Sequence, residues 1–392
     1  MFLVSSKITS SAKNKTLFAY YCMLGFLYIY FYPFANYLTN SEFDGVLNPE
    51  SSARQVYLFY ISSIPIAVLI GRFLLPIIVP LGPARLVNAS NNGRTPRVFF
   101  LFQTIAIISL GCIFILTDID FSILFNRQNR NEGFFVTQAW VIFVYFIQSI
   151  LFVSIYNYKC LSKFEIILSA LIFIMFSFLE VAGIGARRYT VAIIIFYLYR
   201  SGILYYLIFY KIGRLLLILS IIAMIFFGST REYIFHEATG GILQRDISEL
   251  MISSNEFTEI GGGIAKSVAE FQSIDNLRIG ATLLNIPLYF IPRAIFDDKP
   301  LSLTNQYEIP ISIFSELFIN FHILSLFFII LISFLVYRVS IKGSANYFSC
   351  LFAAYALDFI RADFASIFYC MTFSIFFYCL MTRLIKNNRY CL

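Results

Sequence analysis

The segment YFIPRAIFDDKP, at residues 289–300, sets four charged side chains between two prolines, directly after an apolar run. These side chains are Arg293, Asp297, Asp298 and Lys299. A guanidinium binds a phosphate through two parallel hydrogen bonds, whereas a lysine acts as a point charge. Because Pro292 ends the apolar piece, Arg293 is expected at the depth of lipid headgroups. The two aspartates either orient the basic side chains or are turn residues before the second proline.

Three acidic residues are candidates for general-base chemistry. Glu316 shares one face of a predicted helix with Ser312 and Asn320, because each of these residues follows the previous one by four positions. A polar stripe on an apolar helix is expected to face the interior of a helix bundle. Glu316 is there either a base or a hydrogen-bonding group between helices. Glu270 and Asp363 are the other two candidates.

Four further arginines are candidate phosphate ligands. Arg187 in GIGARRYT and Arg231 in GSTREYIF lie beside apolar runs, and Arg278 lies in a long polar segment. Arg361 in LDFIRADF lies three residues after Asp358, close enough on a helix for the two to pair. For each arginine the alternative is an ordinary one, either pairing with a nearby acid or interfacial snorkelling.

The composition defines the elements that must position these residues. The chain has 392 residues, of which 59% are hydrophobic and 13% charged, whereas soluble proteins carry about 25% charged residues. The apolar residues form runs of 18 or more, long enough to cross a bilayer as helices. They do not alternate as the strands of a membrane barrel would. The predicted fold class is an all-α polytopic membrane protein.

Ten apolar runs are predicted to be transmembrane helices. They are 17–38, 56–81, 98–116, 134–156, 165–183, 189–205, 212–228, 312–337, 345–360 and 364–382. The chain then divides into N-terminal helices at 1–228, a large external loop at 229–311 and C-terminal helices at 312–392. Two prolines interrupt the apolar stretch 279–296, which favours a helix lying in the membrane interface.

The distribution of charge predicts the orientation. With both termini inside, the internal segments carry sixteen basic residues, eight of them lysine and eight arginine, as the positive-inside rule expects. The external segments carry twelve, of which ten are arginine. Orientation does not require these external arginines, so they favour a phosphate-bearing ligand on that face. Arg72, inside the second run, either snorkels to the inner surface or marks a polar cavity.

No metal, cofactor or nucleic-acid partner is predicted. The seven cysteines form no CxxC motif and no cluster with the two histidines. The TDID motif at 118–121 is similar to a metal-binding pattern, but it has no further oxygen ligands near it in the sequence.

On these residues the chain resembles the bacterial O-antigen polymerases of the Wzy type. The resemblance covers residues 183–364 as an ordered set of motifs. They are Gly185 with Arg187, then Arg231, Glu270 with Phe271, Ile291-Pro292-Arg293 with Lys299-Pro300, Glu316 to Phe321, and Arg361 with Asp363. Phe296, Ser315 and His322 stand where this family commonly has Trp, Gly and Gly.

The resemblance implies a GT-C-like glycosyltransferase of the Gram-negative inner membrane, with cytoplasmic termini and a periplasmic active site. It would transfer a growing glycan from one undecaprenyl-pyrophosphate carrier to another lipid-linked oligosaccharide, with a chain-length regulator protein as a further partner. The pyrophosphate ligands would then be Arg187, Arg231, Arg278, Arg293, Lys299 and Arg361. Two alternatives remain: an O-antigen ligase or other lipid-phosphate-dependent glycosyltransferase, and a flippase of lipid-linked sugars.

Overall fold

A computed structural model describes residues 15–39, 52–78, 97–116, 138–180, 188–223, 256–273, 278, 280–284, 312–341, 346–362 and 364–387. These residues are helical apart from short turns, and no strand lies among them. The chain forms two compact units. The first contains Met1–Arg85 and Gly202–Phe368, and the second contains Leu86–Ser201 and Tyr369–Leu392.

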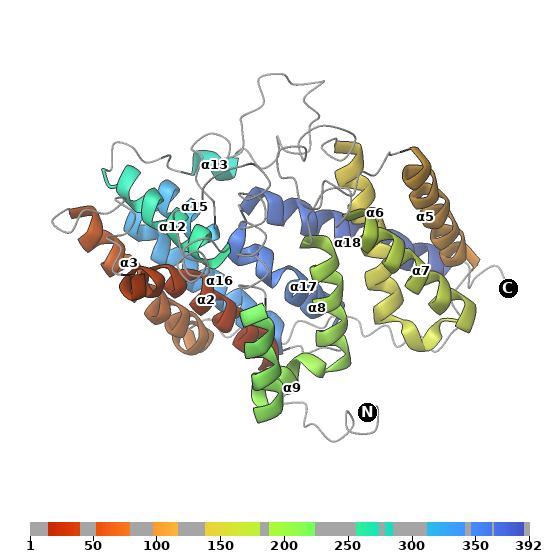
Figure 1. Ribbon diagram of the computed structural model, residues 1–392, viewed down its shortest axis with the longest axis horizontal. Helices are drawn as coiled ribbons and strands as arrows, with labels where there is room; N and C mark the ends of the chain where they lie inside the picture. The colour runs from red at the N-terminus through yellow and green to blue at the C-terminus, as the bar shows by residue number, and fades with distance from the viewer. Residues whose placement is uncertain are drawn as a thin grey trace. The chain divides into compact units, whose positions relative to one another are not determined.

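Figure 1 labels most of the helices of both units. In the first unit the helices are α2 (Thr16–Thr39), α3 (Ser52–Leu69), η3 (Ile70–Leu74), α4 (Leu75–Ile78), α9 (Ile203–Phe209), α12 (Glu256–Glu270), α13 (Ala281–Leu284), α15 (Ile313–Phe321), η11 (His322–Leu324), α16 (Ser325–Ile341) and α17 (Tyr347–Arg361). In the second they are α5 (Arg97–Leu116), α6 (Gln138–Tyr156), η7 (Tyr158–Cys160), α7 (Lys163–Leu179) and α8 (Arg188–Ser201). Helix α18 (Phe364–Asn387) begins in the first unit and continues in the second, and residues 211–223 are also helical.

Three helices of the described chain are long and apolar enough to cross a membrane: Thr16–Tyr37, Ser52–Ile77 and Ile313–Ile341. Helices α8 and α9 make a fourth if they are counted as one span. They are interrupted at Gly202, whose φ of 80° lies in the left-handed region that glycine readily adopts. Each of the ten predicted runs contains a described helix, but the number of crossings, ten, stays a prediction, as does the GT-C fold.

The outer faces of the three long helices carry large exposed apolar side chains. Examples are Phe26, Phe59, Ile66, Phe73 and Phe327. Water does not favour such a surface, whereas lipid tails do, so it is the surface expected of membrane helices. The described structure thus supports the coarse prediction of a helical membrane protein.

Helix α12 is a packed element within the predicted loop 229–311. Its buried residues are Phe257, Ile260, Ile264, Ala265 and Val268. These recur every three or four residues, which is the spacing of one helix face. The face lies against α2, where a Cβ at Gly261 would collide with the side chain of Tyr32 (Figure 1). Glycine at this position therefore permits a close approach of the two helices.

Hydrogen bonds between distant residues join the long helices of the first unit. The backbone N–H of Phe18, in the first turn of α2, donates to Ser340 Oγ of α16 at 3.3 Å. The hydroxyl of Tyr60 in α3 donates to the carbonyl of Phe314 in α15 at 3.1 Å. Both bonds satisfy groups that are buried away from water, which is necessary in a low-dielectric interior.

The second unit is built on two helix pairs, α5 with α7 and α6 with α8. Helix α7 begins with a capping box, in which Ser162 and Glu165 bond each other's backbone N–H groups. The Gln103 amide of α5 donates to Ser169 of α7 at 2.7 Å. Between α6 and α8, the rings of Phe152 and Phe196 stack with centroids 4.5 Å apart.

Candidate functional site

The polar stripe of α15 is buried, as its spacing predicts. Ser312, Glu316 and Asn320 are each no more than 1% exposed. Ser312 is the N-cap of α15, and its hydroxyl accepts from the backbone N–H of Ser315 at 3.1 Å. The stripe therefore faces the protein interior in the first unit, which confirms that part of the prediction.

Both carboxylate oxygens of Glu316 accept hydrogen bonds from other segments. The hydroxyl of Thr282 donates to Oε1 at 2.9 Å, and the backbone N–H of Phe364 donates to Oε2. Phe364 is the first residue of α18, whose first-turn N–H groups have no partner within that helix. Glu316 thus joins α15 to the start of α18. These are the bonds of a positioning residue, and the predicted role as a base stays a prediction.

Residues 278 and 280–284 are hydrogen-bonded to the C-terminal half of α15. The backbone N–H of Arg278 donates to the Ile319 carbonyl at 3.1 Å, and the Asn320 amide donates to the Thr282 hydroxyl at 2.6 Å. Between them Gly280 has a φ of 78°, which allows the chain to turn here. The backbone of Arg278, whose side chain is exposed, is therefore bonded to the helix that carries Glu316.

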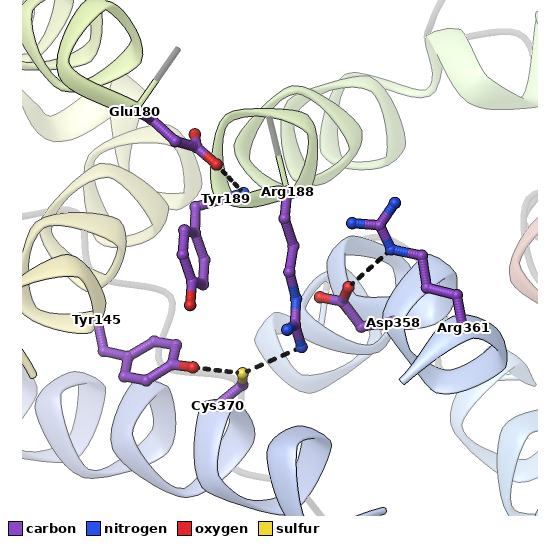
Figure 2. A network of polar contacts seen from close by, with 7 residues as sticks. All are labelled: Tyr145, Glu180, Arg188, Tyr189, Asp358, Arg361 and Cys370. Atoms are coloured by element: carbon purple, nitrogen blue, oxygen red, sulfur yellow. Dashed lines mark hydrogen bonds and ion pairs between the residues drawn. The ribbon is translucent and has the colours of Figure 1, made fainter. Parts of the chain in front are cut away.

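Arg361 and Asp358 form the predicted pair at the end of α17 (Figure 2). Arg361 Nε lies 3.5 Å from Asp358 Oδ1, one helical turn away. The Asp358 side chain is 3% exposed and the Arg361 side chain 20%. A buried carboxylate beside a partly exposed guanidinium restrains the arginine while leaving part of it open to an anion.

A second polar cluster lies within the second unit (Figure 2). The Tyr145 hydroxyl and Cys370 Sγ are 2.7 Å apart, and Arg188 Nη2 lies 3.9 Å from the same sulfur. Glu180, at the end of α7, accepts from the backbone N–H groups of Tyr189 and Thr190, both at 2.7 Å. This carboxylate therefore caps the first turn of α8, which begins at Arg188.

Of the remaining predicted site residues, one is described by the structure and the others are not. Glu270 is the last residue of α12 and is exposed. Arg187, Arg231, Arg293, Lys299 and Asp363 lie outside the described residues, as do most of the predicted interfacial helix 279–296 and the TDID motif. The structure thus joins the helix of Glu316 to the segment that carries Arg278 and to the start of α18, three residues after Arg361.

Sequence reasoning missed Thr282 as a partner of Glu316 and Glu180 as a capping residue. Thr282 gave no signal, because a lone threonine in an apolar stretch is common. Glu180 did have one, since an acid at the end of an apolar run next to a glycine-loosened turn is suited to capping the following helix.

Comparisons with known proteins give no match. No family model matches the chain, and neither a curated protein nor a solved structure does. Within the described residues, no group of three or more His, Cys, Asp or Glu side chains is arranged to hold a metal ion.

Proposed function

We propose that this chain is an O-antigen polymerase of the Wzy type, a glycosyltransferase that joins undecaprenyl-pyrophosphate-linked oligosaccharide units into a polysaccharide. The reaction would take place on the periplasmic face of a bacterial inner membrane. The resemblance over residues 183–364 motivates the proposal, and the apolar helices are compatible with it.

One observation carries the proposal beyond the sequence. The hydrogen bond from the Phe364 N–H to Glu316 joins α15 to the start of α18, 48 residues further along the chain. Glu316 begins the motif Glu316 to Phe321, and Phe364 comes directly after the motif of Arg361 with Asp363 in the sequence. The backbone N–H of Arg278 donates a hydrogen bond to the Ile319 carbonyl of α15. Of the six candidate pyrophosphate ligands, Arg278 is therefore bonded to the helix of Glu316, and Arg361 precedes a bonded residue by three positions.

The chemistry of transfer explains why arginines would be needed. The pyrophosphate leaving group gains negative charge as the glycosidic bond breaks, so a guanidinium beside it stabilises the transition state more than the bound substrate. Such a site requires positioned cations rather than a metal. In this proposal Arg278 and Arg361 bind the pyrophosphate, Asp358 and Glu316 are positioning residues, and Glu270 or Asp363 accepts the proton of the acceptor hydroxyl.

The membrane contributes positioning of its own. Donor and acceptor are both lipid-linked, so their reactive ends meet in one plane and at a similar depth. Holding two reactants in this way replaces part of the entropy that a bimolecular encounter would cost.

Purified protein reconstituted with a single lipid-linked repeat unit provides the test. The wild-type chain is expected to produce a ladder of lengthened glycans, and Arg278→Ala should reduce the yield of polymer by about 10- to 100-fold. Because the Arg278 side chain is exposed, this variant is expected to fold normally. Arg214→Ala, at another exposed arginine of the first unit, is the matched control and should retain activity.

The products distinguish the alternatives. A flippase changes only the sidedness of the lipid-linked unit, and a ligase requires a lipid A-core acceptor. If no ladder forms with the wild-type protein, or if Arg278→Ala yields as much polymer as Arg214→Ala, the proposal is wrong.

A further inference from the structure

Arg72 lies where all three long apolar helices meet. It is not one of the residues assigned to the proposed function. It belongs to η3, a π-helical turn inside the span Ser52–Ile77. Single π turns within helices frequently mark functional positions. The preceding residue, Gly71, approaches α16 so closely that a Cβ would collide with the Ile330 carbonyl. The π turn therefore sets Arg72 directly beside α16.

Aromatic rings surround the Arg72 guanidinium. Its Cζ lies 4.8 Å from the ring centroid of Phe18, 4.7 Å from that of Phe73 and 6.0 Å from that of Tyr337. These rings come from α2, η3 and α16. Cation–π contacts of this kind hold a guanidinium by its faces and leave its N–H edges available.

No acceptor within the described chain uses those edges. Among the described residues, no carboxylate, carbonyl or hydroxyl accepts a hydrogen bond from Arg72, which contacts the three rings there. The side chain is partly exposed. A planar cation held on its faces, with five N–H donors to satisfy, is suited to an anionic oxygen ligand from outside the chain.

The depth of Arg72 indicates which anion is available. Phe18 lies in the first turn of α2, and its N–H is bonded to Ser340, next to the end of α16. The start of one span and the end of another therefore lie at one level, which is the level of a membrane surface. The described charged residues closest in sequence to these two ends are Lys15 and Arg338, both positive. Phosphates of lipid headgroups lie at this depth.

We propose that Arg72, with Phe18 and Tyr337, forms a binding site for the phosphate of a membrane lipid at the surface where α2 begins. The rings fix the guanidinium, and its edges donate to the phosphate oxygens. Two sources have the required chemistry, a glycerophospholipid and a polyprenyl phosphate. The site does not depend on the proposed polymerase activity.

Native mass spectrometry of the purified full-length chain tests the site by titration with three lipids. These are phosphatidylglycerol, undecaprenyl phosphate and diacylglycerol, the last of which has no phosphate. Arg72→Ala should weaken binding of the phosphate-bearing lipid about tenfold. Arg72→Lys keeps the charge but loses the planar stack and should weaken it about threefold. Arg214→Ala, at an exposed arginine of the same unit, should change it by less than about twofold.

A further variant keeps the test valid if Arg72→Ala does not fold. Phe18→Leu retains the cation and an apolar side chain, and it should weaken lipid binding about threefold because one ring contact is lost. Tighter binding of phosphatidylglycerol or of undecaprenyl phosphate supports the site and identifies its source. Equal binding of diacylglycerol, or affinity for phosphate lipids that is unchanged in the folded Arg72 and Phe18 variants, would overturn it.

Discussion

The carboxylate of Glu316 accepts a hydrogen bond from the backbone N–H of Phe364, which lies 48 residues further along the chain. This bond gives the first turn of α18 a partner that the helix cannot supply for itself. Together with the Thr282 bond, it satisfies both oxygens of a glutamate that is only 1% exposed. A buried glutamate therefore joins three segments of the first unit.

Glu316→Gln is expected to retain most stability and activity. The glutamine oxygen accepts from Phe364, and its amide donates to the hydroxyl of Thr282, which serves in either role. Glu316→Ala removes the acceptor of both the Phe364 N–H and the Thr282 O–H and should lower the free energy of unfolding by about 2–4 kcal/mol. Thermal unfolding in detergent and the polymer assay measure the two effects. A stable Glu316→Gln protein whose activity falls about 100-fold or more would instead identify a general base.

Glu180→Gln, unlike Glu316→Gln, should lower the stability of the protein. Both oxygens of Glu180 accept from backbone N–H donors, those of Tyr189 and Thr190. A glutamine amide would oppose one of these donors, so the variant should lose about 1–3 kcal/mol of stability. The same measurement made on Glu316→Gln is its control, because the substitution is chemically identical. Equal melting temperatures for the two variants would contradict the capping geometry.

Gly261→Ala should separate α12 from α2. The added methyl group would collide with Tyr32, and the rearrangement should lower stability by about 1–3 kcal/mol. Gly25→Ala, on α2, is the matched control, since no atom lies within 4 Å of the added carbon. That variant is expected to be neutral, or more stable by up to about 1 kcal/mol, because alanine is the better helix former. A lower melting temperature for the Gly25 variant than for the Gly261 variant would refute the close approach.

Asp358→Asn is expected to reduce polymer yield by about tenfold while the protein still folds. Asparagine has nearly the same shape but no charge, so Arg361 loses the partner 3.5 Å away that restrains it. Chain-length distributions on gels, compared at equal amounts of folded protein, measure the effect. An unchanged distribution would show that the pair does not position Arg361 for the reaction.

The sequence predicted the helices well, because long apolar runs have few other stable conformations in a membrane. For example, the run predicted at 17–38 is α2 at Thr16–Thr39. Helix α12 was missed, because its charges and three consecutive glycines are typical of a loop when read alone. Its apolar residues do follow a helical spacing, and the structure shows that they pack against α2. The π turn at Ile70–Leu74 was missed as well, since it depends on packing against α16.

The candidate site was predictable only along single helices. The spacing of Ser312, Glu316 and Asn320 gave their shared face, and the spacing of Asp358 and Arg361 gave their pairing. The bonds from Thr282 and Phe364 to Glu316 join residues separated by 34 and 48 positions. Local periodicity contains no information about such partners, so they appear only once the chain is folded.

The bond between Phe18 and Ser340 also has a consequence for biosynthesis. The two residues are 322 positions apart, so at about 5–20 residues per second the ribosome needs tens of seconds to reach Ser340 after making Phe18. During that interval the first turn of α2 has neither this acceptor nor the neighbouring surface of α16. Newly inserted α2 must therefore rely on interfacial water, lipid or the insertion machinery until the 322 residues that follow Phe18 have been translated.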